Sequence, residues 1–150
     1  MALSWSISQE NRWKLNFAAG RYFKIPTYTI LGFKDLNNNF INNDSKYTRS
    51  DHLVFGIEYN NSESSRFSIE AFNKKYFNYP ISVNDMVSLA NKGGDFEVLG
   101  NENVSTSGRG KSYGIEFLYQ QKLKNNFYGI LSYTFFYLSL IHISEPTRPR

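Results

Sequence analysis

Cysteine is absent from the sequence, and histidine occurs only at His52 and His142, far apart in the chain. Disulfide bonds and cysteine-based metal sites are therefore excluded, and two distant imidazoles give no basis for a histidine metal site. The sequence also lacks any apolar run of the roughly 18 residues that a membrane-spanning helix needs. No positively charged stretch precedes an apolar run near Met1, so if the protein is exported we expect its start to lie upstream.

Charge of one sign is not concentrated anywhere in the chain. The net charge is +4, and the 17 basic residues are scattered instead of forming a stripe. Proteins that bind nucleic acid neutralise its phosphates with clustered basic residues, so no nucleic-acid partner is expected. No nucleophile, acid–base pair or metal-ligand set emerges at a readable spacing, so we expect neither an enzyme nor a bound cofactor.

Aromatic residues are abundant, with 13 Phe and 11 Tyr, which favours sheets and interfaces. Apolar residues recur at every second position, the period of a β-strand with one apolar face. The pattern predicts an all-β fold, an antiparallel meander of about six strands at 5–7, 13–19, 53–59, 67–71, 113–119 and 127–137. One face of these strands is nearly free of charge, and the other carries Lys14, Glu58, Arg66, Glu70, Lys74 and Glu116.

The connections between the predicted strands alternate between short turns and long loops. Polar turns are expected near 9–11, 60–65 and 121–126, and loops of close to thirty residues at 20–51 and 78–109. Such long loops are uncommon in compact soluble domains, whereas the alternation is typical of outer-membrane barrels. We therefore expect the strands to be part of a larger transmembrane β-barrel, although alternation within each strand also suits a soluble sheet with one buried face.

Large aromatic residues lie close to the predicted short turns, on the apolar face. Side by side, they would form the aromatic girdle at one bilayer interface. Ordinary cross-strand pairing in the core of a sandwich is the alternative. The residues are Trp13, Tyr59, Phe67, Tyr119 and Phe127.

Three segments resemble parts of a known family, the TonB-dependent outer-membrane receptors. GRYFKIP at 20–26 resembles the top of a barrel strand, and GRGKSYGIE at 108–116 resembles the start of a late strand. Residues 79–96 resemble an external loop of such receptors from Bacteroidetes-type bacteria. The resemblance covers about 5–137, and the order and spacing of the motifs are more specific than any single motif.

The resemblance implies a receptor in the cell outer membrane that imports a scarce nutrient ligand from outside the cell. Its partners would be outer-membrane lipid, the ligand, and an inner-membrane energy-transducing complex that acts on a plug domain. The plug and the segment that contacts the transducer precede the barrel in the family. We therefore expect the chain to be a fragment of the C-terminal barrel, without residues for energy coupling.

Barrel closure supports the same expectation, because bacterial barrels begin at about eight strands. Unpaired sheet edges in hydrocarbon cost several kcal/mol per backbone group, or on the order of tens of kcal/mol for two edges. Residues 138–150 resemble the translation of an adapter used in sequencing libraries, and the apolar alternation breaks at Leu138. We expect a partial barrel domain at 1–137 and an artefactual tail at 138–150.

Ligand selectivity in such receptors would lie in loops, where aromatic side chains suit sugars, peptides or chelates. Tyr22, Phe23, Tyr79 and Phe96 are the candidate ligand-binding residues, in a group at the loop ends that also includes Tyr76 and Phe77. Some members of this group would instead form the outer interfacial girdle.

Three other motifs could suggest a catalytic histidine, a calcium loop or a phosphate-binding loop, and we do not favour these interpretations. His52 beside Asp51 lacks a catalytic partner and is expected to be a polar residue at a strand mouth. The Asx-rich segment 35–44 lacks the Gly and Glu of a calcium loop, so a solvated external loop is expected. The segment 108–111 precedes a predicted strand, not a helix, and is expected to lie near lipid headgroup or lipopolysaccharide phosphate.

Two functions besides energised uptake are compatible with the sequence. A passive outer-membrane channel or structural barrel would have the same strands but no plug domain. A soluble carbohydrate-binding β-sandwich would bury the odd-position aromatics against a second sheet.

Overall fold

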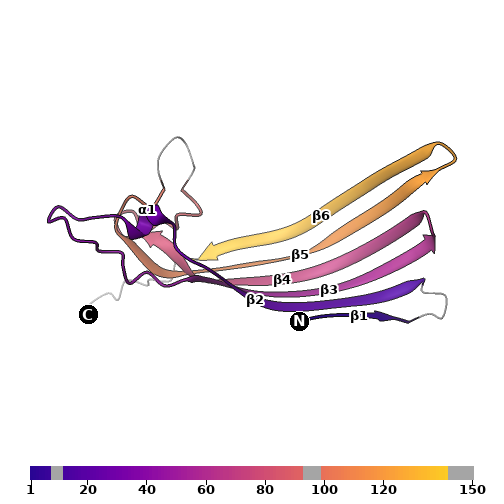
Figure 1. Cartoon of the computed structure of the whole chain (residues 1–150), viewed down its shortest axis with the longest axis horizontal. Coiled ribbons are helices and arrows are strands. Elements are labelled where there is room, and N and C mark those ends of the chain that lie inside the picture. The colour runs from indigo at the N-terminus through magenta and orange to yellow at the C-terminus, as the bar shows by residue number, and fades with distance from the viewer. Residues whose placement is uncertain (8–11, 93–98, 142–150) are drawn as a thin grey trace, which may run out of the picture. The chain divides into compact units, whose positions relative to one another are not determined.

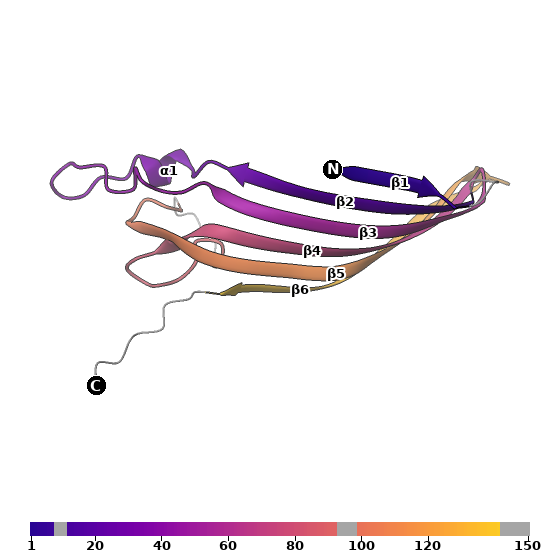
Figure 2. The same cartoon turned by 90° about the horizontal axis from the view of Figure 1, so that it is seen from below.

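Alternation of apolar and polar residues produces strands in each of the six places where it occurs. The computed structural model describes residues 1–7, 12–92 and 99–141. The strands form one antiparallel sheet in chain order, β1-β2-β3-β4-β5-β6, as Figures 1 and 2 show. The elements are β1 (Ala2–Ser6), β2 (Trp13–Lys24), α1 (Tyr28–Leu31), β3 (Thr48–Ser62), β4 (Ser65–Ser82), β5 (Val104–Lys124) and β6 (Phe127–Ile141).

The predicted all-β meander is therefore confirmed, with one short helix that the sequence did not predict. In the first pair, Ala2 lies opposite Ala18 and Ser6 opposite Lys14. β1 and β6 are the two edges of the sheet among the described residues. No helix in the described residues is long and apolar enough to cross a membrane.

The chain divides into two compact units. Unit 1 comprises Met1–Arg21, Asp51–Lys74 and Ser112–Leu138, and unit 2 comprises Tyr22–Ser50, Lys75–Lys111 and Ser139–Arg150, the latter described to residue 141. Unit 1 consists of paired strand segments and their short turns. Unit 2 holds the two long loops, α1 and the strand ends next to those loops.

The alternation of short turns and long loops is confirmed, but the strands are longer than the sequence predicted. Only Glu63 and Ser64 separate β3 from β4, and only Asn125 and Asn126 separate β5 from β6. Both asparagines have positive φ (51° and 61°), the backbone that two-residue hairpin turns require. The predicted turn at 9–11 lies outside the described residues.

The predicted boundaries were wrong where polar residues continue a strand. The loops span 25–47 and 83–103, shorter than the predicted thirty residues, because β3, β4 and β5 extend through polar positions. The segment 108–111, expected to precede a strand, lies within β5. β6 likewise runs past Leu138 to Ile141, since backbone pairing does not depend on the side-chain pattern. The remaining tail, 142–150, lies outside the described residues.

The buried hydrophobic side chains of the described residues all belong to unit 2. Ile30 of α1, Leu89 of the second long loop and Val104 at the start of β5 form one small cluster. Ile81 is also buried. Unit 1 contains no buried large hydrophobic residue among those described, although it holds most of the aromatic strand residues.

Candidate functional site

The exposure of side chains in unit 1 is inverted relative to a soluble sheet. Within unit 1, side chains along β3, β4 and β5 largely alternate between exposed and covered, and most of the large apolar ones are exposed; the exceptions are Val54, Tyr59, Phe72 and Leu118. Between them lie small or polar residues, of which Gly56, Ser68 and Ser112 are buried. The exposed set, which we call the apolar face, is Leu53, Phe55, Ile57, Phe67, Ile69, Tyr113, Ile115, Phe117 and Tyr119.

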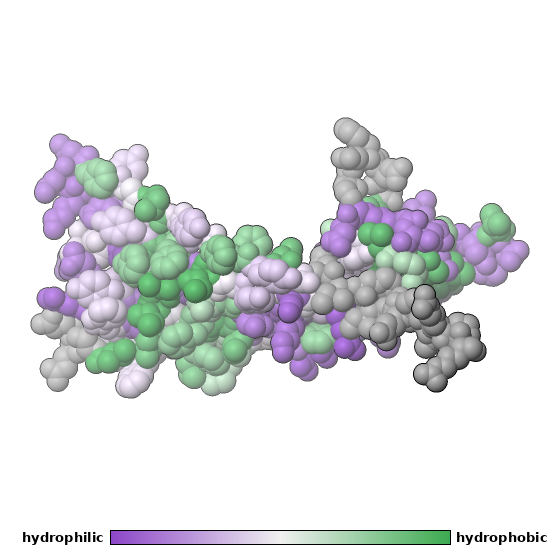
Figure 3. All heavy atoms as spheres, turned by 180° about the vertical axis from the view of Figure 1, so that it is seen from behind, coloured by the Kyte–Doolittle hydropathy of each residue, from purple (hydrophilic) through white to green (hydrophobic). Residues whose placement is uncertain are grey.

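Hydrophobic side chains gather in a band over the strands (Figure 3). At the short-turn end, the ring centroids of Trp13 and Tyr59 lie 4.6 Å apart. Further along, Tyr113 and Tyr137 have ring centroids 5.4 Å apart on neighbouring strands. Trp13, Tyr113 and Tyr137 are exposed and Tyr59 is half-buried, so no covering layer lies over these rings among the described residues.

The opposite face of unit 1 carries the charges. Glu58 pairs with Lys14 (3.7 Å) and with Arg66 (3.6 Å), and Arg66 also donates to Gln120 at 2.9 Å. The Glu58 side chain is 15% exposed, so it lies between two cations in a partly covered position. These groups line an open cavity of about 260 Å³ near the β3–β4 turn. The predicted placement of Lys14, Glu58 and Arg66 on one face is confirmed.

The two long loops are joined through one buried side chain, which the sequence did not single out. Asn42 is 2% exposed, and its amide donates to the carbonyl oxygens of Ile30 (3.0 Å) and Glu102 (2.8 Å). Its oxygen accepts a hydrogen bond from the backbone N–H of Val104 at 3.1 Å. Asn42 therefore ties the first loop to α1 and to the second loop. Its neighbours in the run 37–43 are also mostly asparagine, so composition gave no signal to distinguish it.

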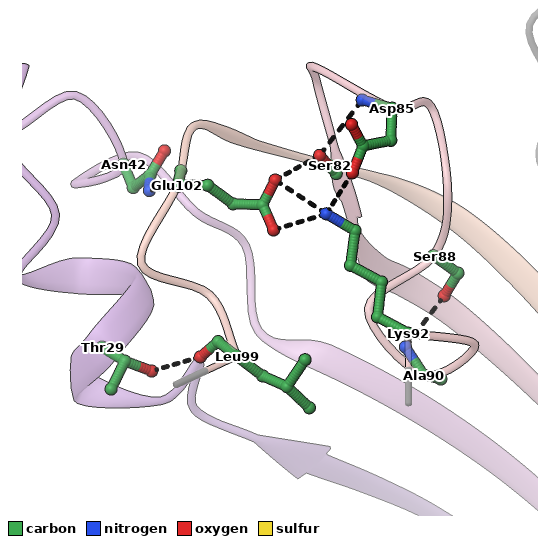
Figure 4. A network of polar contacts seen from close by, with 9 residues as sticks. All are labelled: Thr29, Asn42, Ser82, Asp85, Ser88, Ala90, Lys92, Leu99 and Glu102. Carbon is green, nitrogen blue, oxygen red and sulfur yellow. Dashed lines mark hydrogen bonds and ion pairs between the residues drawn. The ribbon is translucent and has the colours of Figure 1, made fainter. Parts of the chain in front are cut away.

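A second polar network stabilises the loop 83–103 (Figure 4). Lys92 forms ion pairs with Asp85 (2.5 Å) and Glu102 (2.7 Å), and Ser82 donates its hydroxyl to Glu102. Hydrogen bonds to the carboxylates of Asp85 and Glu102 raise the pKa of Lys92 above its ordinary value. Thr29 of α1 also donates to the carbonyl of Leu99 at 2.9 Å. The described parts of the long loops, 25–47, 83–92 and 99–103, are thus connected by specific side-chain contacts.

Three of the four candidate ligand-binding residues, Tyr22, Phe23 and Tyr79, lie within the part of the chain that the structure describes. Tyr22 and Phe23, at the end of β2, are 57% and 63% exposed. Tyr79 lies edge-on to Tyr76 (centroids 6.3 Å apart) and lines an open, largely apolar cavity of about 220 Å³ with Ile25, Leu89 and other loop residues. Neither Tyr22 nor Phe23 is among the described residues that line it. Phe96 lies outside the described residues.

The less favoured motifs have structural explanations. Asp51, next to His52, accepts a two-point ion pair from Arg21 (2.7 and 3.1 Å), which engages the carboxylate between β2 and β3. In the Asx-rich segment, Asp35 accepts hydrogen bonds from the backbone N–H groups of Asn37 and Asn39, as in an Asx turn. The residues that the structure describes contain no group of three or more potential metal-ligating side chains.

Comparisons with protein-family models, with curated proteins and with solved structures find no match to this chain.

Proposed function

We propose that residues 1–137 form part of the wall of an outer-membrane β-barrel, and that this barrel is a receptor for TonB-dependent uptake of a nutrient ligand. The apolar face of unit 1 would contact lipid, the short turns would lie on the periplasmic side, and the long loops would lie outside the cell. The membrane part of this proposal is supported by structure, and the receptor part by the resemblance of 20–26, 79–96 and 108–116 to that family.

The inverted exposure of unit 1 is the observation that carries the proposal. In water, an exposed band of large apolar side chains is unfavourable by roughly 25 cal/mol per Å² of apolar surface left uncovered. In a bilayer the same band is in contact with its preferred solvent, and the charged face is turned to the aqueous or protein-filled interior. The ion-paired Glu58 on the covered face fits that second environment.

A soluble sandwich is less well supported, because it buries its apolar face against a second sheet. The described residues contain one sheet, and in unit 1 none of its large hydrophobic side chains is buried. A passive channel would have the same wall, so the structure of unit 1 does not distinguish a channel from a receptor. The difference lies in a plug domain, which a channel does not need.

Labelling of alternate positions tests the membrane part. Single cysteines at 53–59 and 113–119 would be introduced into the genomic reading frame that contains residues 1–137, and a fluorophore attached in the outer-membrane fraction. Absence of native cysteine from these residues keeps the labels unambiguous. Quenching by lipid-borne nitroxide should peak at the exposed odd positions and quenching by aqueous iodide at the even ones. Equal aqueous quenching at both sets would exclude a lipid-facing wall.

The same reading frame tests the receptor part. It should encode a signal peptide and a plug domain before Met1, and further alternating strands in place of 138–150. Uptake of ligand by cells that express it should stop when the inner-membrane proton gradient is collapsed. A frame without a plug, or uptake that survives loss of the gradient, would favour the passive channel.

A further inference from the structure

Unit 2 contains an open groove with a basic lining that the proposed function does not use. It has a volume of about 590 Å³ and is lined by residues of the first long loop, of β3 and β4, and of the first part of β5. We call it the basic groove. Its lining residues are Lys46, Arg49, Phe77, Asn78, Ser105, Thr106, Ser107 and Arg109.

Three of these residues are cations, and no carboxylate is among the described residues that line the groove. Three cations around one concave space raise the local concentration of anions. The remaining lining residues, apart from Phe77, carry hydroxyl or amide groups that can donate hydrogen bonds.

Several contacts hold the donors in position. The guanidinium of Arg49 lies 4.0 Å from the centroid of the Phe77 ring, a cation–π contact that holds it in place. Thr106 accepts a hydrogen bond from the backbone N–H of Lys46 at 3.3 Å, so its own hydroxyl hydrogen remains available. Ser105 donates to Ser107 at 3.1 Å, which likewise leaves the Ser107 hydrogen available.

Close packing of β4 against β5 brings Arg109 into the groove. A Cβ added to Gly108 would lie 2.7 Å from the carbonyl oxygen of Tyr79, a distance that no larger residue tolerates without a shift. Asn78 also donates to the carbonyl oxygen of Tyr47 at 3.1 Å, which holds the end of the first loop next to β4. The lining is thus set by strand packing and loop contacts before any ligand is present.

We propose that the basic groove binds a phosphate-class oxyanion. Two guanidinium groups, one ammonium and several hydroxyl groups in the same lining match the several oxygens and the double negative charge of a phosphate group better than a single carboxylate. The phosphate could be carried by a lipid headgroup or by a soluble ion, and both would use the same contacts. The groove is defined within unit 2, so this inference stands or falls separately from the proposed membrane wall.

Binding is tested on the full chain in a nonionic detergent, which adds no charge of its own. Inorganic phosphate is titrated by calorimetry in the first arm. In the second, phosphatidylcholine and phosphatidylglycerol are added to the detergent micelles, so that no bilayer insertion is required, and the retention of each lipid on purification is measured. We expect saturable phosphate binding, weakened about tenfold by Arg49→Gln and by Arg109→Gln, as for loss of one charge-assisted hydrogen bond.

Lys124→Gln is the matched control, because this exposed lysine lies on the same strand as Arg109 but outside the groove. It should leave phosphate binding unchanged, and Arg109→Lys, which keeps the charge, should weaken it by less than Arg109→Gln. Preferential retention of phosphatidylglycerol that the two glutamine variants abolish would identify a lipid headgroup as the source. Phosphate binding without lipid preference would identify a soluble anion. Absence of binding in both arms, or equal loss in the Lys124→Gln control, would overturn the proposal.

Discussion

The side-chain oxygen of Asn42 accepts a hydrogen bond from the backbone N–H of Val104 at 3.1 Å, across 62 residues of sequence. The same side chain donates to the carbonyl oxygens of Ile30 and Glu102. A single buried amide therefore satisfies three backbone groups from three segments of unit 2. Buried polar groups that lose their partner cost far more than the bond itself contributes.

Asn42→Ala should open the loop cluster locally. It removes the partner of the Val104 N–H and of the Glu102 carbonyl oxygen, whereas the Ile30 carbonyl oxygen still accepts from the Phe33 N–H at 3.3 Å. The free energy of local opening should fall by about 1–3 kcal/mol for each group left buried and unpaired. Amide hydrogen exchange at Val104 and in α1 should accelerate accordingly. Asn43→Ala, at the exposed neighbouring position, should leave exchange unchanged. Equal protection in both variants would show that the loops are held together without Asn42.

Gly114→Ala should weaken the pairing of β5 with β6. A Cβ at this position would lie 2.4 Å from the carbonyl oxygen of Phe135 and 2.7 Å from the Cβ of Phe136, so the neighbouring backbone must shift. Overpacking of this kind typically costs about 1–3 kcal/mol. Gly129→Ala is the matched control in β6, because its nearest atom would lie 3.7 Å away on the Phe127 side chain.

Thermal unfolding of the two glycine variants measures the difference. The midpoint should fall for Gly114→Ala and stay near the wild-type value for Gly129→Ala. A similar midpoint for both would mean that β6 is not packed on β5 at Gly114.

Lys92 should remain protonated at a higher pH than an ordinary lysine. Its pKa is raised by hydrogen bonds to Asp85 and Glu102, so its contribution to stability is complete below the ordinary value of 10.5 and is lost as the pH rises through the raised value. Only the neutral amine reacts with acetic anhydride, so the pH midpoint of acetylation at each lysine can be followed by mass spectrometry. Glu102→Gln should lower the Lys92 midpoint, and a wild-type midpoint at or below that of a free lysine would contradict the network.

The sequence predicted the sheet well because apolar residues recur at every second position in the predicted strands. Residues such as Phe55, Ile57 and Glu58 alternate strictly, and a meander follows from the short turns between them. Strand ends were predicted less well. The mainly polar residues of 60–62 and 121–124 continue the strands through backbone pairing, and their side chains show no alternation from which a strand could be predicted. Asn42 and the basic groove depend on contacts between segments far apart in the chain, which no local pattern encodes.

Phe55→Arg should impair assembly into the outer membrane if the proposed lipid contact is correct. Phe55 lies in the middle of β3 on the apolar face and is 46% exposed, and a cation on the lipid face near the bilayer midplane costs about 2–4 kcal/mol. Val54→Arg is the matched control, because Val54 lines a cavity with Gly56 and Glu70, where an added cation meets a carboxylate. In the full reading frame, the heat-modifiable, protease-resistant band should be reduced for Phe55→Arg and retained for Val54→Arg. If the control variant were the one that lost the band, the faces would be reversed, with lipid against the charged side of the sheet.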